Sequence, residues 1–91
     1  ADRDLNLVVD ESLRWGPLAA TVQEAAGSLL ESLQYRETYR DPNNKDGAGK
    51  KRLMFSLTFR HADRTLTSDE VDAACSQVVT TCQQKLGARL L

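Results

Sequence analysis

The side-chain types that most often carry catalysis are sparse in this sequence. Its one histidine, His61, lies in a predicted turn with no serine or cysteine arranged near it as a nucleophile, so we expect it to be solvated or to cap the turn. Cys75 and Cys82 lack the C-x-x-C or Cys/His spacing of a zinc site. The run GAGKK at 47–51 lacks the full G-x-x-x-x-G-K-[ST] pattern of a phosphate loop. We therefore expect no catalytic, cofactor or metal site in this chain.

Polar and basic side chains at alternate strand positions favour a different chemistry. Short polar side chains can read base edges or sugar hydroxyls of single-stranded RNA, while Arg and Lys hold its phosphates. The candidates are Asn6, Gln34, Ser56 and Thr58, edged by Arg36 and Arg60, with Lys50 and Lys51 reaching in from a loop. An outward aromatic pair for base stacking is missing from the central strand. The pattern predicts a hydrogen-bonding nucleic-acid surface, although any solvated sheet face has a similar composition.

Size and charge limit the classes of protein that this chain can belong to. Its 91 residues suit one domain with one modest core. The 12 basic and 13 acidic residues leave a net charge of −1, which argues against strong, non-specific nucleic-acid binding. No apolar run approaches the roughly 20 residues that span a bilayer. Cys75 and Cys82 would have Cα atoms about 10 Å apart on one helix, too far for a disulfide. Such buried thiols indicate a reducing compartment, most simply the cytoplasm.

The most clearly patterned elements are a strand at 53–60 and the helix that follows it. Apolar residues at 53, 55, 57 and 59 alternate with mostly small or polar ones, which predicts a sheet with one apolar face. Thr67 and Glu70 have the spacing of a capping box, and Leu66 with Val71 can form a hydrophobic staple. These signals predict a helix at 68–86 that ends at Gly87.

The rest of the chain supplies matching elements. We expect strands at 2–10, 29–40 and 88–91, a helix at 17–26 with Pro17 first and Gly27 as its left-handed stop, and a loop at 41–51. In the strand at 29–40, Leu33 and Tyr35 should face inward and Ser32, Gln34, Arg36 and Thr38 outward. Tyr39 does not fit that alternation, which indicates a bulge or a strand end nearby. Trp15, just before the first helix, either closes one end of the core or stacks on a base.

This order is β-α-β-β-α-β, an α+β ferredoxin-like fold with a four-stranded antiparallel sheet and both helices on one face. The helix-covered face should carry Leu5, Leu7, Leu33, Leu53, Phe55, Leu57 and Phe59. The opposite face should display Asn6, Val8, Gln34, Arg36, Met54, Ser56, Thr58 and Arg60.

Longer motifs add a family resemblance. GKKRLMFSLTFR at 49–60, followed by DRTLTSDEV at 63–71, resembles the ferredoxin-fold anticodon-binding domain at the C-terminus of the bacterial phenylalanyl-tRNA synthetase β subunit. Arg3-Asp4-Leu5, GSLLESLQYRETY at 27–39 and LGARLL at 86–91 continue the match, so it covers nearly the whole chain. The family often has an aromatic residue at the position of Arg36, which leaves the strand register there open.

The resemblance implies a tRNA-binding module, residues 1–91, excised from a longer chain. It implies contact with the anticodon stem-loop of phenylalanine tRNA and no catalysis by the module itself. Aminoacylation, with ATP and magnesium, would belong to the parent phenylalanine-tRNA ligase. The synthetase α subunit and the other β-subunit domains of the parent heterotetramer would be partners. The residues that the resemblance puts at or near the RNA are Arg3, Lys50, Lys51, Ser56 and Arg60, whereas Arg64 and Thr67 would be structural.

A second hypothesis needs no RNA. A ferredoxin-like domain can also be a protein-interaction or purely structural unit, docked through a sheet edge or through a patch of Met54 and Val8. It would associate with a polypeptide in a salt-insensitive way and have no affinity for RNA. A small phosphatase-like hydrolase on the same fold is a more distant alternative.

Overall fold

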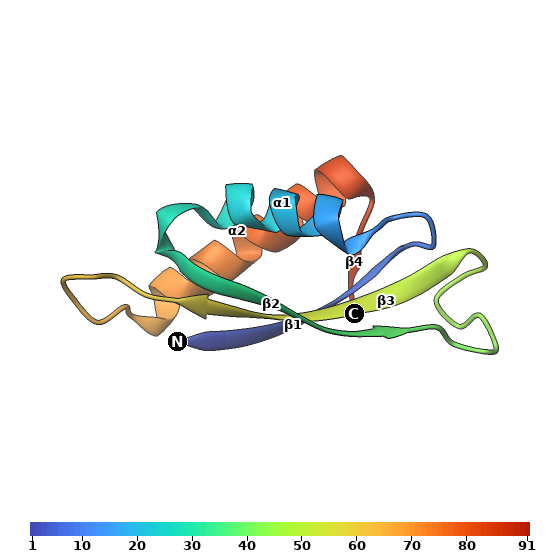
Figure 1. Ribbon diagram of the computed structural model, residues 1–91, viewed down its shortest axis with the longest axis horizontal. Coiled ribbons are helices and arrows are strands. Elements are labelled where there is room, and N and C mark those ends of the chain that lie inside the picture. Colours follow the sequence, from blue (N-terminus) through green and yellow to red (C-terminus); the bar gives the residue numbers. More distant parts are fainter.

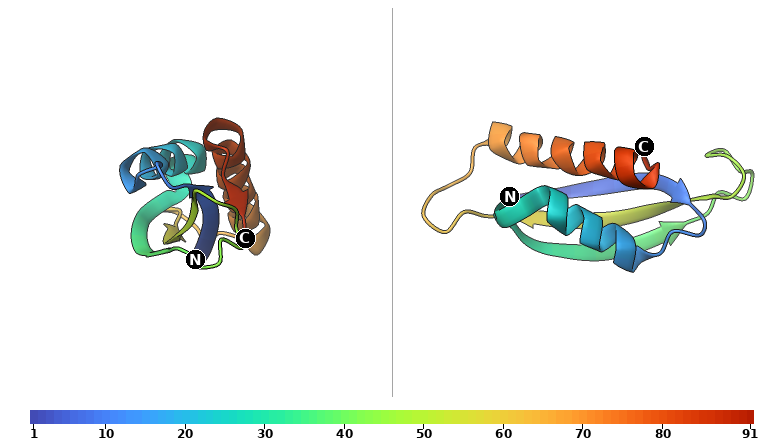
Figure 2. Two further views of the ribbon diagram at one scale, coloured as in Figure 1. Left: turned by 90° about the vertical axis from the view of Figure 1, so that its right-hand side faces the viewer. Right: turned by 90° about the horizontal axis from the view of Figure 1, so that it is seen from above.

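The computed structural model describes all residues from Ala1 to Leu91 and confirms the ferredoxin-like fold (Figure 1). Its elements are β1 (Asp2–Asp10), α1 (Trp15–Ala26), the 3-10 turn η1 (Gly27–Leu29), β2 (Leu30–Tyr39), β3 (Lys50–Phe59), α2 (Ser68–Leu86) and β4 (Arg89–Leu90). The strands form one antiparallel sheet in the order β2-β3-β1-β4. Both helices cover the same face of this sheet, as Figure 2 shows from above. Neither helix has an apolar stretch long enough to cross a membrane.

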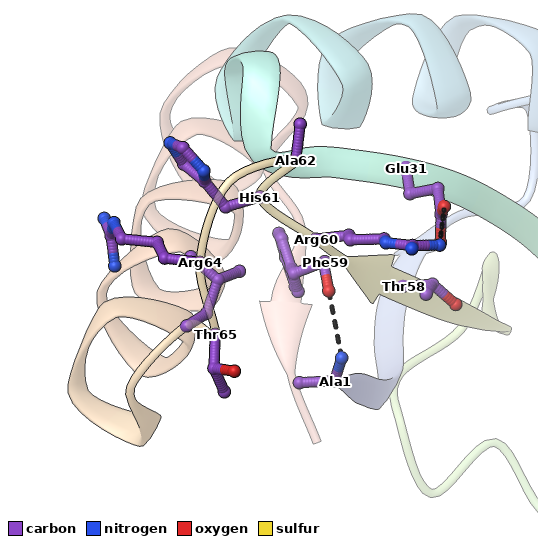
Figure 3. Close-up of a pocket in the computed structure, with 10 residues that line it drawn as sticks. Ala1, Glu31, Thr58, Phe59, Arg60, His61, Ala62, Arg64 and Thr65 are labelled. Carbon is purple, nitrogen blue, oxygen red and sulfur yellow. Dashed lines mark hydrogen bonds and ion pairs between the residues drawn. The ribbon is translucent and has the colours of Figure 1, made fainter.

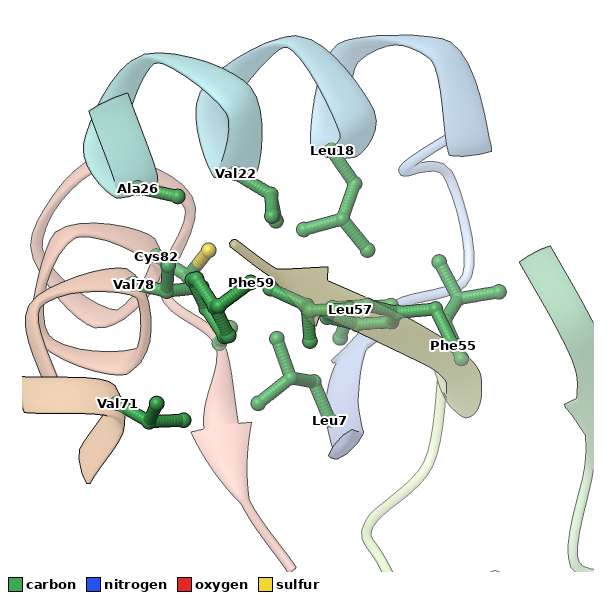
Figure 4. Packing of buried hydrophobic residues seen from close by; sticks show 13 residues of the cluster. Leu7, Leu18, Val22, Ala26, Phe55, Leu57, Phe59, Val71, Val78 and Cys82 are labelled. Atoms are coloured by element: carbon green, nitrogen blue, oxygen red, sulfur yellow. The ribbon is translucent and has the colours of Figure 1, made fainter. Parts of the chain in front are cut away.

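The hydrophobic core fills the space between the helices and one face of the sheet (Figure 4). The apolar residues of β1 and β3 that alternation assigned to this face pack against α1 and α2. The Trp15 ring lies 5.5 Å from the Phe55 ring, measured between centroids, and is half-buried. Trp15 therefore closes one end of the core, which is the first of the two roles that its position suggested.

Both helices use the predicted terminal signals, with two differences in detail. The capping box of Thr67 and Glu70 is formed in both directions, and Gly87 ends α2 in the left-handed conformation. Helix α1 begins at Trp15, so Pro17 is the third helical residue. A missing N–H costs little there because the first-turn N–H groups have no partner within the helix. Gly27 has a positive φ but ψ of −152°, which is not the left-handed helical conformation, and the chain continues into η1.

Strand β2 contains two bulges, at Glu31 and Arg36, where its pairing with β3 shifts by one residue. The predicted irregularity is thus confirmed, and it lies at Arg36. An extra residue reverses which side chains face the helices beyond that point. Thr38 consequently pairs with Leu53 on the helix side, so its predicted outward position was wrong. Tyr39, paired with Arg52, comes to the opposite face.

The connection between β2 and β3 is shorter than predicted. β3 begins at Lys50, three residues before the predicted start, and its first residues pair with the end of β1. Lys50 and Lys51 therefore lie in a strand rather than in a mobile loop. Because neighbouring strand residues face opposite ways, these two lysines are on different faces of the sheet.

Candidate nucleic-acid interface

The sheet face away from the helices, which we call the open face, is arranged in cross-strand rows. Each row has one residue of β3 in the middle, flanked by a residue of β1 and one of β2. From one end to the other, the rows are Asp2–Thr58–Ser32, Asp4–Ser56–Gln34, Asn6–Met54–Glu37 and Val8–Arg52–Tyr39. Arg89 of β4 pairs with Val8 and extends the last row. We call the first two rows the polar end and the last row the hairpin end.

Two aspartates occupy the polar end. The Ser56 hydroxyl donates a hydrogen bond to Asp4 Oδ1 (2.5 Å) and accepts one from Arg36 Nε (2.9 Å). The Thr58 hydroxyl donates to Asp2 Oδ1 (2.9 Å). Ser56 is only 8% exposed, although it lies on the uncovered face. The hydroxyls of Ser56 and Thr58, both candidates from the sequence, therefore already bond to the carboxylates of Asp4 and Asp2. The alternation pattern alone did not identify these two carboxylates.

The hairpin end combines an aromatic ring with cations. The Arg52 guanidinium lies 5.0 Å from the centroid of the Tyr39 ring. Arg52 also donates two hydrogen bonds to Asp46 of the β2–β3 hairpin, from Nε at 2.7 Å and from Nη2 at 3.1 Å. These bonds hold the pKa of Asp46 below its usual value, and the charge of Arg89 contributes to that lowering. The Asp46 carboxylate thus holds the Arg52 guanidinium against the ring of the exposed Tyr39.

Sequence reasoning missed this combination of Tyr39, Arg52 and Arg89. The signal that could have found it is the break in alternation around Tyr39, because a bulge at the position before Glu37 brings both Glu37 and Tyr39 to the open face. Arg89 forms no ion pair. An aromatic ring with adjacent cations can stack a nucleic-acid base and hold its phosphate.

Most of the candidate RNA residues do lie on the open face. Asn6 is half-buried there, and its Oδ1 atom is buried without a hydrogen-bond partner. Lys50 lies beyond the hairpin end and donates from Nζ to Asp10 Oδ1 at 2.5 Å. The candidates on this face are Asn6, Gln34, Arg36, Lys50, Ser56 and Thr58.

Three other candidates lie elsewhere. Arg60 follows the end of β3 and is exposed, with Nη1 3.3 Å from Glu31 Oε1, at the edge of a 470 Å³ hollow (Figure 3). Arg3 lies on the helix side, with Nη2 3.6 Å from Asp72 Oδ1 of α2. Lys51 is also on the helix side and is only 8% exposed. The prediction that it reaches the RNA from a loop was therefore wrong.

The β3–α2 connection has a structural role in this arrangement. The His61 Nδ1 atom accepts a hydrogen bond from the Asp63 backbone N–H at 3.1 Å, in agreement with the predicted turn role. Arg64 donates from Nη1 and Nη2 to the two carboxylate oxygens of Glu70. This bidentate pair, with the Thr67 bonds, lowers the pKa of Glu70 to about 2. In Figure 3, His61 and Arg64 point away from Arg60, so the basic groups of this connection do not converge.

Two open hollows lie over the middle of the open face. One, of 390 Å³, is lined by Asp4, Leu5, Asn6, Arg36, Met54, Phe55 and Ser56. The other, of 240 Å³, is lined only by polar residues: Asp2, Asp4, Ser32, Gln34, Arg36, Ser56 and Thr58. The hollows share the connected side chains Arg36, Ser56 and Asp4. A ligand here would meet hydrogen-bond donors and acceptors side by side.

The apolar docking patch of the second hypothesis is not present. Val8 is on the open face by register but is only 3% exposed, and Met54 is half-buried. Larger exposed apolar side chains occur at the C-terminal edge, at Leu90 and Leu91.

The two cysteines belong to the helix layer. Cys82 is fully buried in the core, and Cys75 is half-buried. Burial raises the pKa of both thiols, which favours the neutral form expected of packing residues. No group of three or more His, Cys, Asp or Glu side chains is placed to hold a metal ion.

Comparison with known proteins identifies the family. A model of the ferredoxin-fold anticodon binding domain matches residues 1–91. The phenylalanine–tRNA ligase beta subunit of Rhodopirellula baltica is 44% identical over 89 residues, which are 98% of this chain and 13% of that protein. Those of Shouchella clausii and Streptomyces avermitilis are each 40% identical, over 97% and 99% of this chain. The chain spans only 11–13% of the length of these relatives. This chain belongs to the ferredoxin-fold anticodon-binding domain family.

Proposed function

We propose that this domain binds the anticodon stem-loop of phenylalanine tRNA through its open face, as a non-catalytic part of a phenylalanine–tRNA ligase β subunit. The observation that carries the proposal is the row of Val8, Arg52, Tyr39 and Arg89, which presents an aromatic ring and two cations on a face that the helices leave uncovered. Three relatives that match nearly the whole chain carry that ligase name.

Each part of the open face has a separate task in this proposal. Tyr39 offers a ring on which an unpaired base of the loop stacks. Arg52, on the neighbouring strand, and Arg89, at the other end of the row, hold phosphates, since guanidinium groups match phosphate geometry. The residues proposed for base edges, sugar hydroxyls or further phosphates are Asn6, Arg36, Lys50, Ser56, Thr58 and, beyond the polar end, Arg60. Arg3 and Lys51 are left out of the contact surface because they lie on the helix side.

The isolated domain should bind RNA weakly. Its net charge is −1, and the cations Arg52 and Lys50 already pair with Asp46 and Asp10. RNA phosphates must replace these carboxylates. Each phosphate contact therefore contributes to the binding free energy only the difference between two similar ion pairs. A longer ligase chain would add affinity by keeping the module close to the same tRNA, which raises the effective concentration.

The chemistry of aminoacylation belongs elsewhere in the parent enzyme under this proposal. ATP and magnesium would bind the catalytic part of the ligase, with the α subunit and the other β-subunit domains as protein partners. The intact ligase would work in the cytoplasm. Loss of this module would then lower the affinity for tRNA and leave phenylalanine activation by ATP unchanged.

Binding of this 91-residue chain to the phenylalanine-tRNA anticodon stem-loop, measured at low and at physiological salt, tests the proposal. The matched control is a stem-loop with the same stem and a replaced anticodon. We expect preferential binding that weakens steeply as salt increases. Equal affinity for both stem-loops, or tight and salt-insensitive binding to a polypeptide of the ligase instead, would overturn the proposal in favour of a protein-docking role.

A further inference from the structure

We propose that Arg36 and Asp4 form a donor–acceptor pair that reads the edge of one RNA base at the polar end of the open face. This inference rests on the proposed function and adds a second recognition element, separate from the stacking ring at the hairpin end. It assigns Arg36 to a base rather than to a phosphate. It also means that a carboxylate, that of Asp4, contributes favourably to RNA binding.

The first support is the way the two side chains are held. Ser56 lies between them, accepts from Arg36 Nε and donates to Asp4 Oδ1. Since Ser56 is 8% exposed, this central link is shielded from water. Arg36 forms no ion pair, and no hydrogen bond occupies its two terminal nitrogens or Asp4 Oδ2. A pre-oriented donor and a pre-oriented acceptor are therefore left free beside each other.

The second support is the space around this pair. Both hollows of the open face, of 390 and 240 Å³, are lined by Arg36, Ser56 and Asp4, so a ligand entering either one meets all three side chains. The larger hollow is also lined by Asn6, whose buried Oδ1 atom has no hydrogen-bond partner. A buried polar atom without a partner is uncommon.

The third support is the local charge, which favours a base over a phosphate. Asp2 and Asp4 are on the same face as Arg36, and Glu37 follows it in β2. Three carboxylates around one free guanidinium repel a phosphate, whereas a base edge is neutral and carries both donors and acceptors. Arg pairs well with base acceptors, and carboxylates accept from base N–H groups. Unpaired loop bases are read in this way through their exposed edges.

The test compares two aspartates that carry equal charge on the same face. Asp4→Asn removes the free acceptor but keeps an oxygen for Ser56, and Asp2→Asn makes the same charge change one row away. Affinities of this chain and its variants are measured for a panel of phenylalanine-tRNA stem-loops in which each anticodon base is replaced in turn. Thermal unfolding of each variant shows that the fold is retained.

We expect Asp4→Asn to reduce discrimination at one anticodon position by about tenfold, the typical value of a good base contact. Arg36→Lys keeps the positive charge but loses the paired N–H donors of the guanidinium group, so it should reduce discrimination at that same position. Asp2→Asn should change every affinity by one common factor. The proposal is overturned when Asp4→Asn and Asp2→Asn shift the whole panel equally, since the carboxylates then act only by repulsion. A wild-type chain that binds no member of the panel refutes the proposed function itself.

Discussion

Phe55 and Ser56 are neighbours in β3, and both are nearly inaccessible to water, but they are buried by opposite means. Phe55, 1% exposed, is enclosed by the hydrophobic core under Trp15. Ser56, 8% exposed, is enclosed by Arg36 and Asp4, which are both exposed themselves. One strand thus separates a face that is closed by packing from a face that is closed by polar side chains.

The two kinds of burial have different consequences for the molecule. Burying a large apolar side chain contributes about 1.5–3 kcal/mol, and nothing in solution can replace the lost packing. A hydrogen bond to a charged group, such as those that Ser56 forms with Arg36 and Asp4, also contributes about 1.5–3 kcal/mol, but water or a ligand can take the place of either partner. The covered face should therefore determine stability, and the open face should determine binding.

Phe55→Ala should give the largest effect. It removes a fully buried ring and leaves a cavity, so we expect the free energy of unfolding to fall by about 3–5 kcal/mol. Urea denaturation measures this change. Met54→Ala, on the open face one residue earlier, is the control and should cost clearly less. Similar losses for both variants would contradict the division of roles between the two faces.

Tyr39→Ala should weaken RNA binding with little change in stability. Loss of one stacking ring typically costs about 1–3 kcal/mol of binding free energy. Tyr35→Ala is a matched control, because Tyr35 is 43% exposed, Tyr39 is 38% exposed, and Tyr35 lies on the helix side of the same strand. Titration of a labelled stem-loop would show the difference, and an equal effect of the two substitutions would place the RNA somewhere other than the open face.

Arg52→Gln should lower the salt dependence of RNA binding. One lost phosphate contact reduces the slope of log K against log salt by about one unit. Arg64→Gln removes an arginine that pairs with Glu70 away from the open face, and it should leave that slope unchanged. The slopes come from binding isotherms at several salt concentrations. A slope unaffected by Arg52→Gln would remove this residue from the phosphate-binding set.

The smallest expected effect is an acid-dependent loss of stability from the capping box of α2. The pKa of Glu70 falls from 4.5 to about 2 because Arg64 and Thr67 donate hydrogen bonds to its carboxylate. A lowered pKa stabilises the folded state above pH 4.5, and this contribution is lost as the pH falls toward 2.

The measurement is the midpoint of urea denaturation at a series of pH values. Between pH 4.5 and pH 2, this midpoint should fall less steeply in the Glu70→Gln variant than in the unsubstituted chain. RNA binding by Glu70→Gln at neutral pH should match that of the unsubstituted chain, because Glu70 is remote from the open face. A profile of the same steepness in both proteins would show that other carboxylates cause the acid-dependent loss.

Much of the fold could be predicted from the sequence because its signals are local. Alternation in β3, the capping box at Thr67 and Glu70, and the glycine at 87 each depend on residues a few positions apart. Part of the candidate site followed from the same alternation, which correctly assigned Asn6, Ser56 and Thr58 to one face. The start of β3 at Lys50 was missed because strand length depends on a partner strand, here the end of β1.

The sequence by itself determined the order of the elements, the side of the sheet that the helices cover and the family of the domain, because periodicity and motifs are properties of the chain. Only the tertiary structure decided what the open face presents. The bulge at Arg36, which brings Tyr39 beside Arg52, depends on register with another strand. The aspartates that engage Ser56 and Thr58 come from positions 52 and 56 residues away. Such contacts depend on how the strands align across the sheet, which local spacing does not encode.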